Sequence, residues 1–186
     1  NPDGVQRCIT DTISDAKISA DEIDAINGHL NAVVRRLDDE AFAAADAADA
    51  AVAAGDELGP LHGVPCSIKE NIDVAGTPTT QGVVAFAEAI APIDAPTTAR
   101  MRAAGAIPFV RTNLPDFGLR VHTDSQLHGL TRNPWNPNVT AGGSSGGRAQ
   151  ERARTSVATC TYGSRASRRL MVRRALHPSV AGRSAP

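Results

Sequence analysis

Aromatic residues, lysine and cysteine are scarce in this chain. Phe, Trp and Tyr make up 3% of its 186 residues, so alanine and branched aliphatic side chains must supply most of the packing. Small side chains bury little apolar area, at about 25 cal/mol per Å², and a core built from them has a narrow margin of stability. The length still suffices for one domain with a sizeable core.

The three cysteines argue against a disulfide framework or a zinc site. Cys8, Cys66 and Cys160 form no CxxC pair and have no metal-binding spacing with histidine. Cys66 falls within the strand expected at residues 63–69, and we expect it to be a small buried hydrophobe rather than a nucleophile. We therefore predict no metal and no cofactor.

Long apolar runs are also missing. None approaches the roughly 20 residues that span a bilayer, and the first residues have neither the basic nor the apolar region of a signal peptide. The sequence therefore predicts a cytoplasmic location and no membrane partner. The chain also lacks an initiator methionine, and we expect it to be processed or truncated.

The net charge of −1 conceals an asymmetry. Residues 1–147 contain nineteen acidic and ten basic residues. Residues 148–186 contain nine arginines and a single acidic residue, Glu151. We therefore divide the chain into an α/β portion, residues 1–147, and a divergent Arg-rich tail, residues 148–186. A basic arm, a disordered segment, a recombinant scar or a shifted reading frame would each give such a tail. We favour the shifted frame, since GC-rich genes read out of frame yield Arg, Ala, Ser and Pro.

Helical patterns recur through residues 1–147. A capping box at residues 19–22 precedes an apolar stripe of Ile23, Ile26 and Leu30, which predicts a docking helix. Residues 38–54 are rich in alanine and end at a glycine, which predicts an outer helix over a sheet. Residues 94–104 predict a third helix, and Pro115 is expected to begin a fourth.

Two short stretches between the helices have strand patterns. Residues 63–69 alternate as a half-buried strand does, and residues 106–111 predict a buried strand in which Pro108 indicates an edge or irregular position. Strand, helix and strand at this spacing predict a βαβ crossover. The expected fold class is therefore α/β, with a mostly parallel or mixed sheet flanked by helices.

Two features indicate a site. Residues 140–147 read TAGGSSGG, and their glycines let the backbone turn tightly beside a ligand, although such runs also form flexible linkers. Lys69 ends the strand at 63–69, where loss of hydration would favour its neutral form and let it act as a base. The chain has two lysines against seventeen arginines, which suggests that a permanently charged arginine would not serve at position 69.

Five ordered motifs carry a resemblance to a known family. They are residues 59–65 (GPLHGVP), residues 67–73 (SIKENID), Thr112 with Asn113, residues 133–136 (NPWN) and residues 142–147 (GGSSGG). In this order and spacing, the region from about Ile23 to Gly147 resembles the amidase signature family. The resemblance implies an incomplete amidase-signature fold and hydrolysis of a small-molecule carboxamide by a Ser–cis-Ser–Lys triad.

The resemblance also implies roles for single residues. Lys69 looks like the general base, and Ser144, in a cis peptide, looks like the bridging serine. Gly143 and Ser145 would support the loop. Residues 117–119 resemble substrate-facing positions, of which Gly118 is the best candidate, while ordinary packing against a sheet is the alternative for Phe117 and Leu119.

The nucleophile of the family is missing. In the family it lies downstream, in an Asp-x-Gly-Gly-Ser stretch whose amides form the oxyanion hole. Residues 161–169 read TYGSRASRR instead, and neither Ser164 nor Ser167 has the flanking glycine amides. We therefore expect an amidase-like carbon–nitrogen hydrolase with little or no activity in this chain.

Four alternatives stay open at this point. The chain could be a non-catalytic fragment, a protein like the glutamine-hydrolysing component of an amidotransferase, or a module that binds nucleic acid through its basic tail. The tail has no aromatic platform or RNA-binding motif, which makes nucleic acid the less favoured partner. Phosphate binding by the glycine loop is weaker still, because the Gly-Lys-Ser/Thr ending is absent.

Other polar or aromatic residues are expected to be structural. His122, Asp124 and His128 do not share a helical face, and we expect polar contacts from them rather than a metal or catalytic site. His62 is expected to form a structural hydrogen bond. Trp135, the only tryptophan, is expected to pack beneath the glycine loop with a partner for its indole N–H.

Overall fold

The structure is a computed structural model that describes residues 23–25, 27–147 and 158–159. The capping box at residues 19–22, Ile26, Cys8, Cys160 and the candidate serines Ser164 and Ser167 lie outside the described residues. Ile23 and Leu30 are buried and helical, as the apolar stripe predicts.

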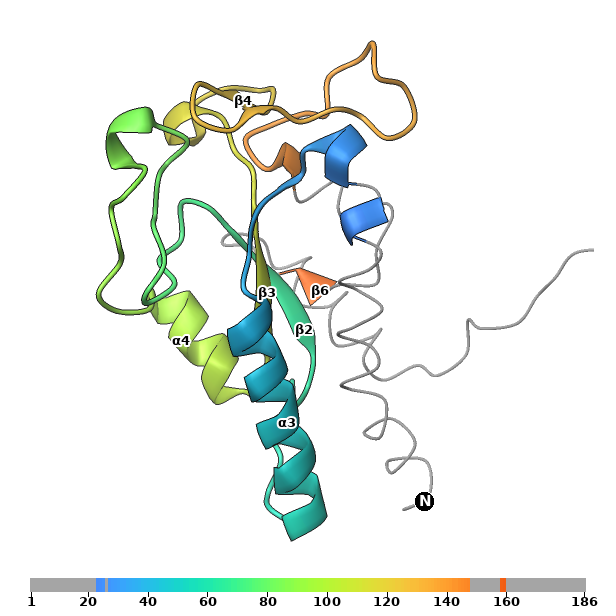
Figure 1. The fold of residues 1–186 in the computed structure, drawn as a ribbon, viewed down its shortest axis with the longest axis vertical. Helices are drawn as coiled ribbons and strands as arrows, with labels where there is room; N and C mark the ends of the chain where they lie inside the picture. The colour runs from blue at the N-terminus through green and yellow to red at the C-terminus, as the bar shows by residue number, and fades with distance from the viewer. Residues whose placement is uncertain (1–22, 26, 148–157, 160–186) are drawn as a thin grey trace, which may run out of the picture.

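A mixed four-stranded sheet forms the centre of the described fold (Figure 1). Its strands lie in the order β1 (Val33–Arg36), β3 (Ile107–Thr112), β2 (Pro65–Lys69) and β6 (Ala158–Thr159). β2 pairs in parallel with both β3 and β6, whereas β1 pairs antiparallel with β3. The α/β fold class is therefore confirmed, and the sheet extends beyond Gly147.

The predicted crossover joins the two central strands. The chain passes from β2 through η1 (Val84–Phe86) and α4 (Pro96–Ala103) to β3. Pro96 occupies the first turn of α4, where a missing N–H leaves no helical hydrogen bond unmade. This connection confirms the βαβ unit.

The alanine-rich helix has the bounds that the sequence predicts. α3 (Asp38–Ala54) ends at Gly55, whose φ of 78° gives the left-handed cap. Ala41 and Ala45 are buried, and their small side chains let the helix approach the sheet. Phe42 packs edge to face against Phe109 of β3, with ring centroids 6.5 Å apart.

Two clusters of buried apolar residues make up the described core. The cluster beside α3 consists of Ile23, Val33, Ala41, Ala45, Ile107, Phe109 and Val110. The cluster that contacts α4 consists of Leu37, Cys66, Ile68, Val74 and Ala106. Cys66 is 0% exposed, which confirms its prediction as a buried hydrophobe. His62 Nε2 lies 3.0 Å from Ala48 O, so its structural contact is also confirmed.

Pro108 does not lie at an edge. β3 is a central strand, paired with β1 and β2. The second expectation, an irregular position, is right. Cys66 pairs with Pro108 and the next residue, Ser67, pairs with Val110, so the register shifts by one residue of β3 at this point. This bulge accommodates a residue that has no N–H to give to the sheet.

The helix predicted from Pro115 does not form. The structure has only the short 3₁₀ turn η2 (Asp116–Gly118), and Phe117 within it has a φ of 51°. Two consecutive left-handed residues, Phe117 and Gly118, turn the chain sharply and prevent an α-helix. The chain then forms the hairpin of β4 (Asp124–Ser125) and β5 (Gly129–Leu130).

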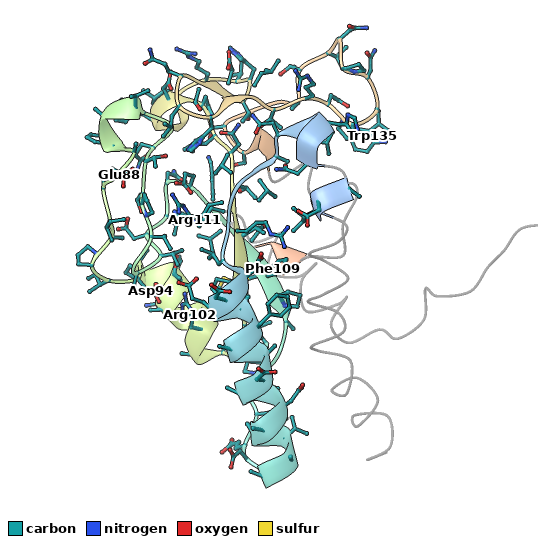
Figure 2. All side chains as sticks on the ribbon, in the orientation of Figure 1. Glu88, Asp94, Arg102, Phe109, Arg111 and Trp135 are labelled. Atoms are coloured by element: carbon teal, nitrogen blue, oxygen red, sulfur yellow. The ribbon has the colours of Figure 1, made fainter. Side chains whose placement is uncertain are left out.

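Trp135 does not pack beneath the glycine loop. Its side chain is 76% exposed, on the loop that leads away from the sheet (Figure 2). Asn133 Oδ1 accepts a hydrogen bond of 3.0 Å from the Trp135 N–H, which closes a local turn at this exposed position. Among the described residues, no helix has both the length and the apolar character needed to cross a membrane.

Phe109→Ala should destabilise the fold strongly, because the ring is 0% exposed and fills the space between α3 and the sheet. We expect a loss of about 3–5 kcal/mol in the free energy of unfolding, measured by urea denaturation. Phe86→Ala is the matched control, since this ring is 40% exposed. Equal losses in the two variants would contradict the assigned core.

Candidate active site

Lys69 and Ser144 meet at the end of β2. Lys69 is the last residue of the strand, and it is only 7% exposed. Its Nζ donates a hydrogen bond of 3.0 Å to Ser144 Oγ, across 75 positions of sequence. The fold therefore brings the residue resembling a general base into contact with the residue resembling a bridging serine.

The glycine loop that carries Ser144 is packed and is not a flexible linker. The Gly143–Ser144 peptide bond is cis. A Cβ on Gly143 would lie 2.6 Å from Arg120 O and 2.7 Å from His122 N, so only glycine fits against this segment. Ser145 is half-buried next in the same loop.

Gly118 borders the Lys69–Ser144 pair. A Cβ on this residue would lie 3.7 Å from Ser144 Oγ and 3.9 Å from Lys69 Nζ. Its neighbours Phe117 and Leu119 are 52% and 83% exposed, so the alternative of packing against the sheet is wrong for both. The position of Gly118 beside the pair is compatible with a substrate-facing role, which stays a prediction.

A buried ion pair that the sequence analysis missed follows Lys69 directly. Glu70 and Arg111 are 1% and 0% exposed, and Arg111 Nε lies 3.3 Å from Glu70 Oε2. The Arg111 guanidinium also donates hydrogen bonds to Ile72 O and Pro78 O and to the Thr77 hydroxyl. Arg111 therefore fastens the loop after β2 to the centre of the sheet (Figure 2).

Burial dominates the electrostatics of this pair. It raises the pKa of the Glu70 carboxyl, while the charge of Arg111 opposes that shift. Burial likewise lowers the pKa of Arg111, and the charge of Glu70 opposes it. The available signals in the sequence were an arginine inside an apolar strand and a carboxylate directly after another strand.

Asn113 is a second buried residue whose structural role the sequence motifs do not indicate. It directly follows β3 and is 0% exposed. Its Nδ2 donates hydrogen bonds to Gly129 O at 3.1 Å and to Thr131 Oγ1 at 3.0 Å. Asn113 therefore ties the end of the sheet to the β4–β5 hairpin. Asn113 belongs to the Thr112–Asn113 motif, but the motif alone does not show which residues its side chain contacts.

Of the polar residues near the hairpin, His128 makes a side-chain contact, whereas the expected contacts of His122 and Asp124 stay predictions. His128 Nε2 lies 3.1 Å from Thr80 Oγ1. Burial lowers the pKa of His128, and the charge of Arg35 adds to this effect. Within the part of the chain that the structure describes, no group of three His, Cys, Asp or Glu residues could hold a metal ion.

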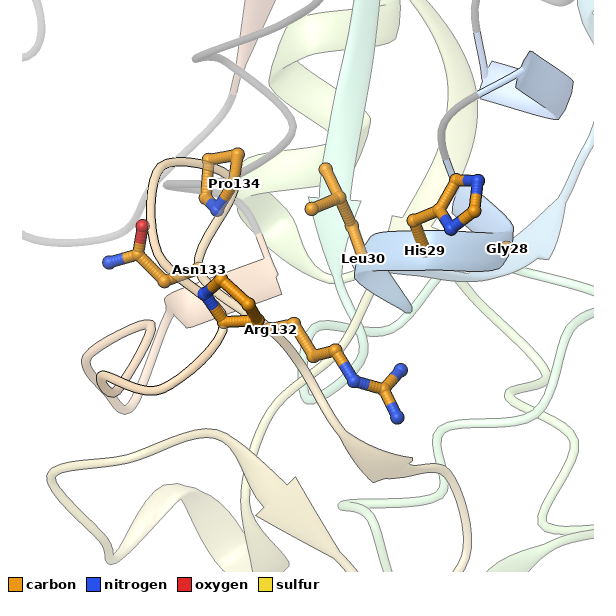
Figure 3. Close-up of a pocket in the computed structure, with 7 residues that line it drawn as sticks. Gly28, His29, Leu30, Arg132, Asn133 and Pro134 are labelled. Atoms are coloured by element: carbon orange, nitrogen blue, oxygen red, sulfur yellow. The ribbon is translucent and has the colours of Figure 1, made fainter.

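A pocket of about 420 Å³ lies between the helical segment before β1 and the loop after β5 (Figure 3). Its lining residues are Gly28, His29, Leu30, Arg132, Asn133, Pro134 and Pro137. Neither Lys69 nor Ser144 lines it. The pocket is therefore separate from the hydrogen-bonded pair, and we base no function on it.

Arg111→Met should leave Glu70 buried without its counter-charge and destabilise the fold by about 3–5 kcal/mol. Because the folded-state pKa of Glu70 is raised, its contribution to stability is present below the ordinary pKa of a glutamate and is lost as pH rises through the folded value. We therefore expect the destabilisation of Arg111→Met to grow from acidic to neutral pH in urea denaturation.

The double variant Arg111→Met with Glu70→Gln is the control for this charge effect. Replacing the carboxylate by an amide should remove the pH dependence and recover part of the stability. The contacts of Arg111 with Ile72 O and Pro78 O stay lost in both variants. A destabilisation independent of pH in the single variant would contradict the assigned charge pair.

Gly118→Ala should affect both the backbone and the site. At a φ of +69° an alanine is strained by about 1–2 kcal/mol, and its Cβ would contact Ser144 and Lys69. Gly76→Ala is a matched control, with a φ of +78° and no atom within 4 Å of its Cβ. We expect similar losses in urea denaturation, but slower acylation of Lys69 by acetic anhydride only in Gly118→Ala. Equal Lys69 acylation in the two variants would show that Gly118 does not border an open site.

Comparison with known proteins supports the resemblance. A model of the amidase family matches residues 17–159. An indoleacetamide hydrolase of Bradyrhizobium diazoefficiens is 54% identical over 127 residues, which cover 68% of this chain and 24% of that protein. A component of the glutamyl-tRNA(Gln) amidotransferase of Moorella thermoacetica is 38% identical over 127 residues, covering 68% of this chain and 26% of that protein.

The fold agrees with solved structures of the same family. A bacterial aryl acylamidase of the amidase signature enzymes has a TM-score of 0.71 at 34% identity, covering 75% of this chain and 29% of that chain. The chain spans about a quarter of the length of the curated relatives that it matches. The family match extends over all of the described residues and includes both β2 and β6. The chain therefore belongs to the amidase family, the amidase signature enzymes.

Proposed function

We propose that this chain supplies the general base and the bridging serine of an amidase that hydrolyses a carboxamide to a carboxylate and an amine or ammonia. The observation that supports this most is the 3.0 Å contact of Lys69 Nζ with Ser144 Oγ. A lysine so little exposed, with a hydroxyl as its partner, is an arrangement in which a proton can pass between the two groups.

In the proposed mechanism, neutral Lys69 takes the proton of Ser144 while Ser144 takes the proton of the attacking serine. The serine oxygen adds to the amide carbonyl, and the C–N bond then breaks as the proton returns through Ser144 to the leaving nitrogen. Water cleaves the resulting acyl-enzyme by the same relay. Gly118 would leave space for the amide beside the two side chains.

This sequence lacks the motif that carries the attacking serine in the family. No Asp-x-Gly-Gly-Ser stretch follows the glycine loop. Loss of a single oxyanion-hole donor already lowers kcat by about 10²–10³. We therefore propose that the chain by itself has little or no turnover, as expected of a truncated amidase.

The substrate that we propose is a small-molecule amide. The relative at 54% identity is named an indoleacetamide hydrolase, whereas the amidotransferase component is 38% identical over a stretch of the same length. This difference favours direct hydrolysis of an amide over glutamine hydrolysis for transamidation. A cytoplasmic location is part of the same proposal.

A chimaera tests the relay apart from the missing nucleophile. Residues 23–147 of this chain would replace the corresponding part of the Bradyrhizobium indoleacetamide hydrolase. We expect the chimaera to hydrolyse indoleacetamide, and Lys69→Ala or Ser144→Ala to lower kcat by about 10²–10⁴. Arg102→Ala, at a partly exposed ion pair of α4 (Figure 2), should leave kcat unchanged.

The unmodified chain is assayed in parallel. We expect no hydrolysis of indoleacetamide and no serine labelled by a fluorophosphonate, as mapped by mass spectrometry. A labelled serine would show that the chain does supply a nucleophile and would refute the proposed inactivity. Chimaera activity that survives loss of both Lys69 and Ser144 would refute the relay.

A further inference from the structure

A single buried hydroxyl joins the two ends of the loop that carries Ser144. Thr123 is 0% exposed and lies directly before β4. Its Oγ1 donates a hydrogen bond of 3.0 Å to Gly142 O and accepts one of 2.9 Å from the Gly146 N–H. The three residues between these contacts are Gly143, Ser144 and Ser145, so the hydroxyl bridges the turn that contains the relay serine.

The contact requires both a hydroxyl at position 123 and a glycine at position 146. A hydroxyl can donate and accept at once, and here it uses both capacities. A Cβ on Gly146 would lie 2.8 Å from Thr123 Cβ and would collide with its Oγ1. Without the hydroxyl, the buried Gly146 N–H would lose its partner, which is more costly than an ordinary lost contact.

Thr123 is itself fixed to the sheet that presents Lys69. Its carbonyl accepts a hydrogen bond of 2.9 Å from the Thr131 N–H. The Thr131 hydroxyl accepts from Asn113 Nδ2 at 3.0 Å and donates to Asn31 O at 2.7 Å. Asn113 directly follows Thr112, and Thr112 is the register partner of Lys69.

A continuous series of hydrogen bonds therefore links the end of β3 to both sides of Ser144. Lys69 is placed at the same end of the sheet, because β2 pairs with β3 and Lys69 lies opposite Thr112. We propose that Thr123 is a positioning residue, which keeps Ser144 Oγ within hydrogen-bond distance of Lys69 Nζ. The inference rests on the proposed function, because positioning matters to catalysis only if this pair is a proton relay.

Acylation of Lys69 in the full chain tests the inference without requiring turnover. The chain has only two lysines, so the rate of Lys69 acetylation by acetic anhydride can be measured against Lys17 by mass spectrometry. Ser144→Ala removes the hydroxyl that accepts a hydrogen bond from Lys69 Nζ and should raise this ratio about tenfold. Thr123→Val, which keeps the shape of the side chain but not its hydroxyl, should raise the ratio to a similar extent.

Two further variants separate positioning from general destabilisation. Thr123→Ser restores the hydroxyl and should return the ratio to that of the unmodified chain. Thr98→Val removes another buried hydroxyl, which donates 2.8 Å to Asp73 O at α4, and should leave the ratio unchanged. Thermal unfolding of all four variants, followed by circular dichroism, shows whether they are folded at the temperature of the assay.

Each remaining outcome overturns the inference. If Ser144→Ala raises the ratio and Thr123→Val does not, Thr123 does not position Ser144, although the Lys69–Ser144 contact stands. If neither variant changes the ratio, the Ser144 contact does not control the reactivity of Lys69, and the proposed function fails as well. If Thr98→Val or Thr123→Ser behaves as Thr123→Val does, the effect comes from lost stability and not from the bridging hydroxyl.

Discussion

The parallel pairing of β2 with β3 is the constraint on which the rest of the described structure depends. The register brings Lys69 opposite Thr112, so the last residues of both strands meet at one edge of the sheet. In open α/β sheets the carboxyl ends of the strands are where ligands bind, because the loops that follow them converge there. Lys69, Glu70 and Asn113 all lie at this edge, and the glycine loop meets it through Ser144.

Buried ionisable side chains are concentrated in the same place. A lysine, a glutamate and an arginine with exposures of 7%, 1% and 0% lie at or near the end of β2 and in β3. Burying such groups is tolerated only where partners replace water. The backbone carbonyls of residues 72 and 78 supply partners for Arg111, while Ser144 supplies one for Lys69. The loop after β2 and the glycine loop therefore supply hydrogen-bond acceptors to these buried side chains.

Patterns with local causes predicted the helices and strands well. α3 follows from alanine content and a terminal glycine, and the crossover through α4 follows from the spacing of two apolar strands. The wrong predictions concern residues whose surroundings a pattern of residue types does not specify. Pro108 lies in a central strand because a bulge accommodates it, and Trp135 is exposed on a loop that Asn133 turns locally.

The sequence by itself determined the α/β class, the amidase resemblance and the identity of Lys69 and Ser144 as candidates, because these depend on composition, periodicity and ordered motifs. Only the tertiary structure decided that the two side chains touch, that Glu70 pairs with Arg111, and that Thr123 bridges the ends of the glycine loop. The physical reason is that each contact joins residues far apart along the chain. Their distance is set by strand register and loop packing, neither of which leaves a local signal in the sequence.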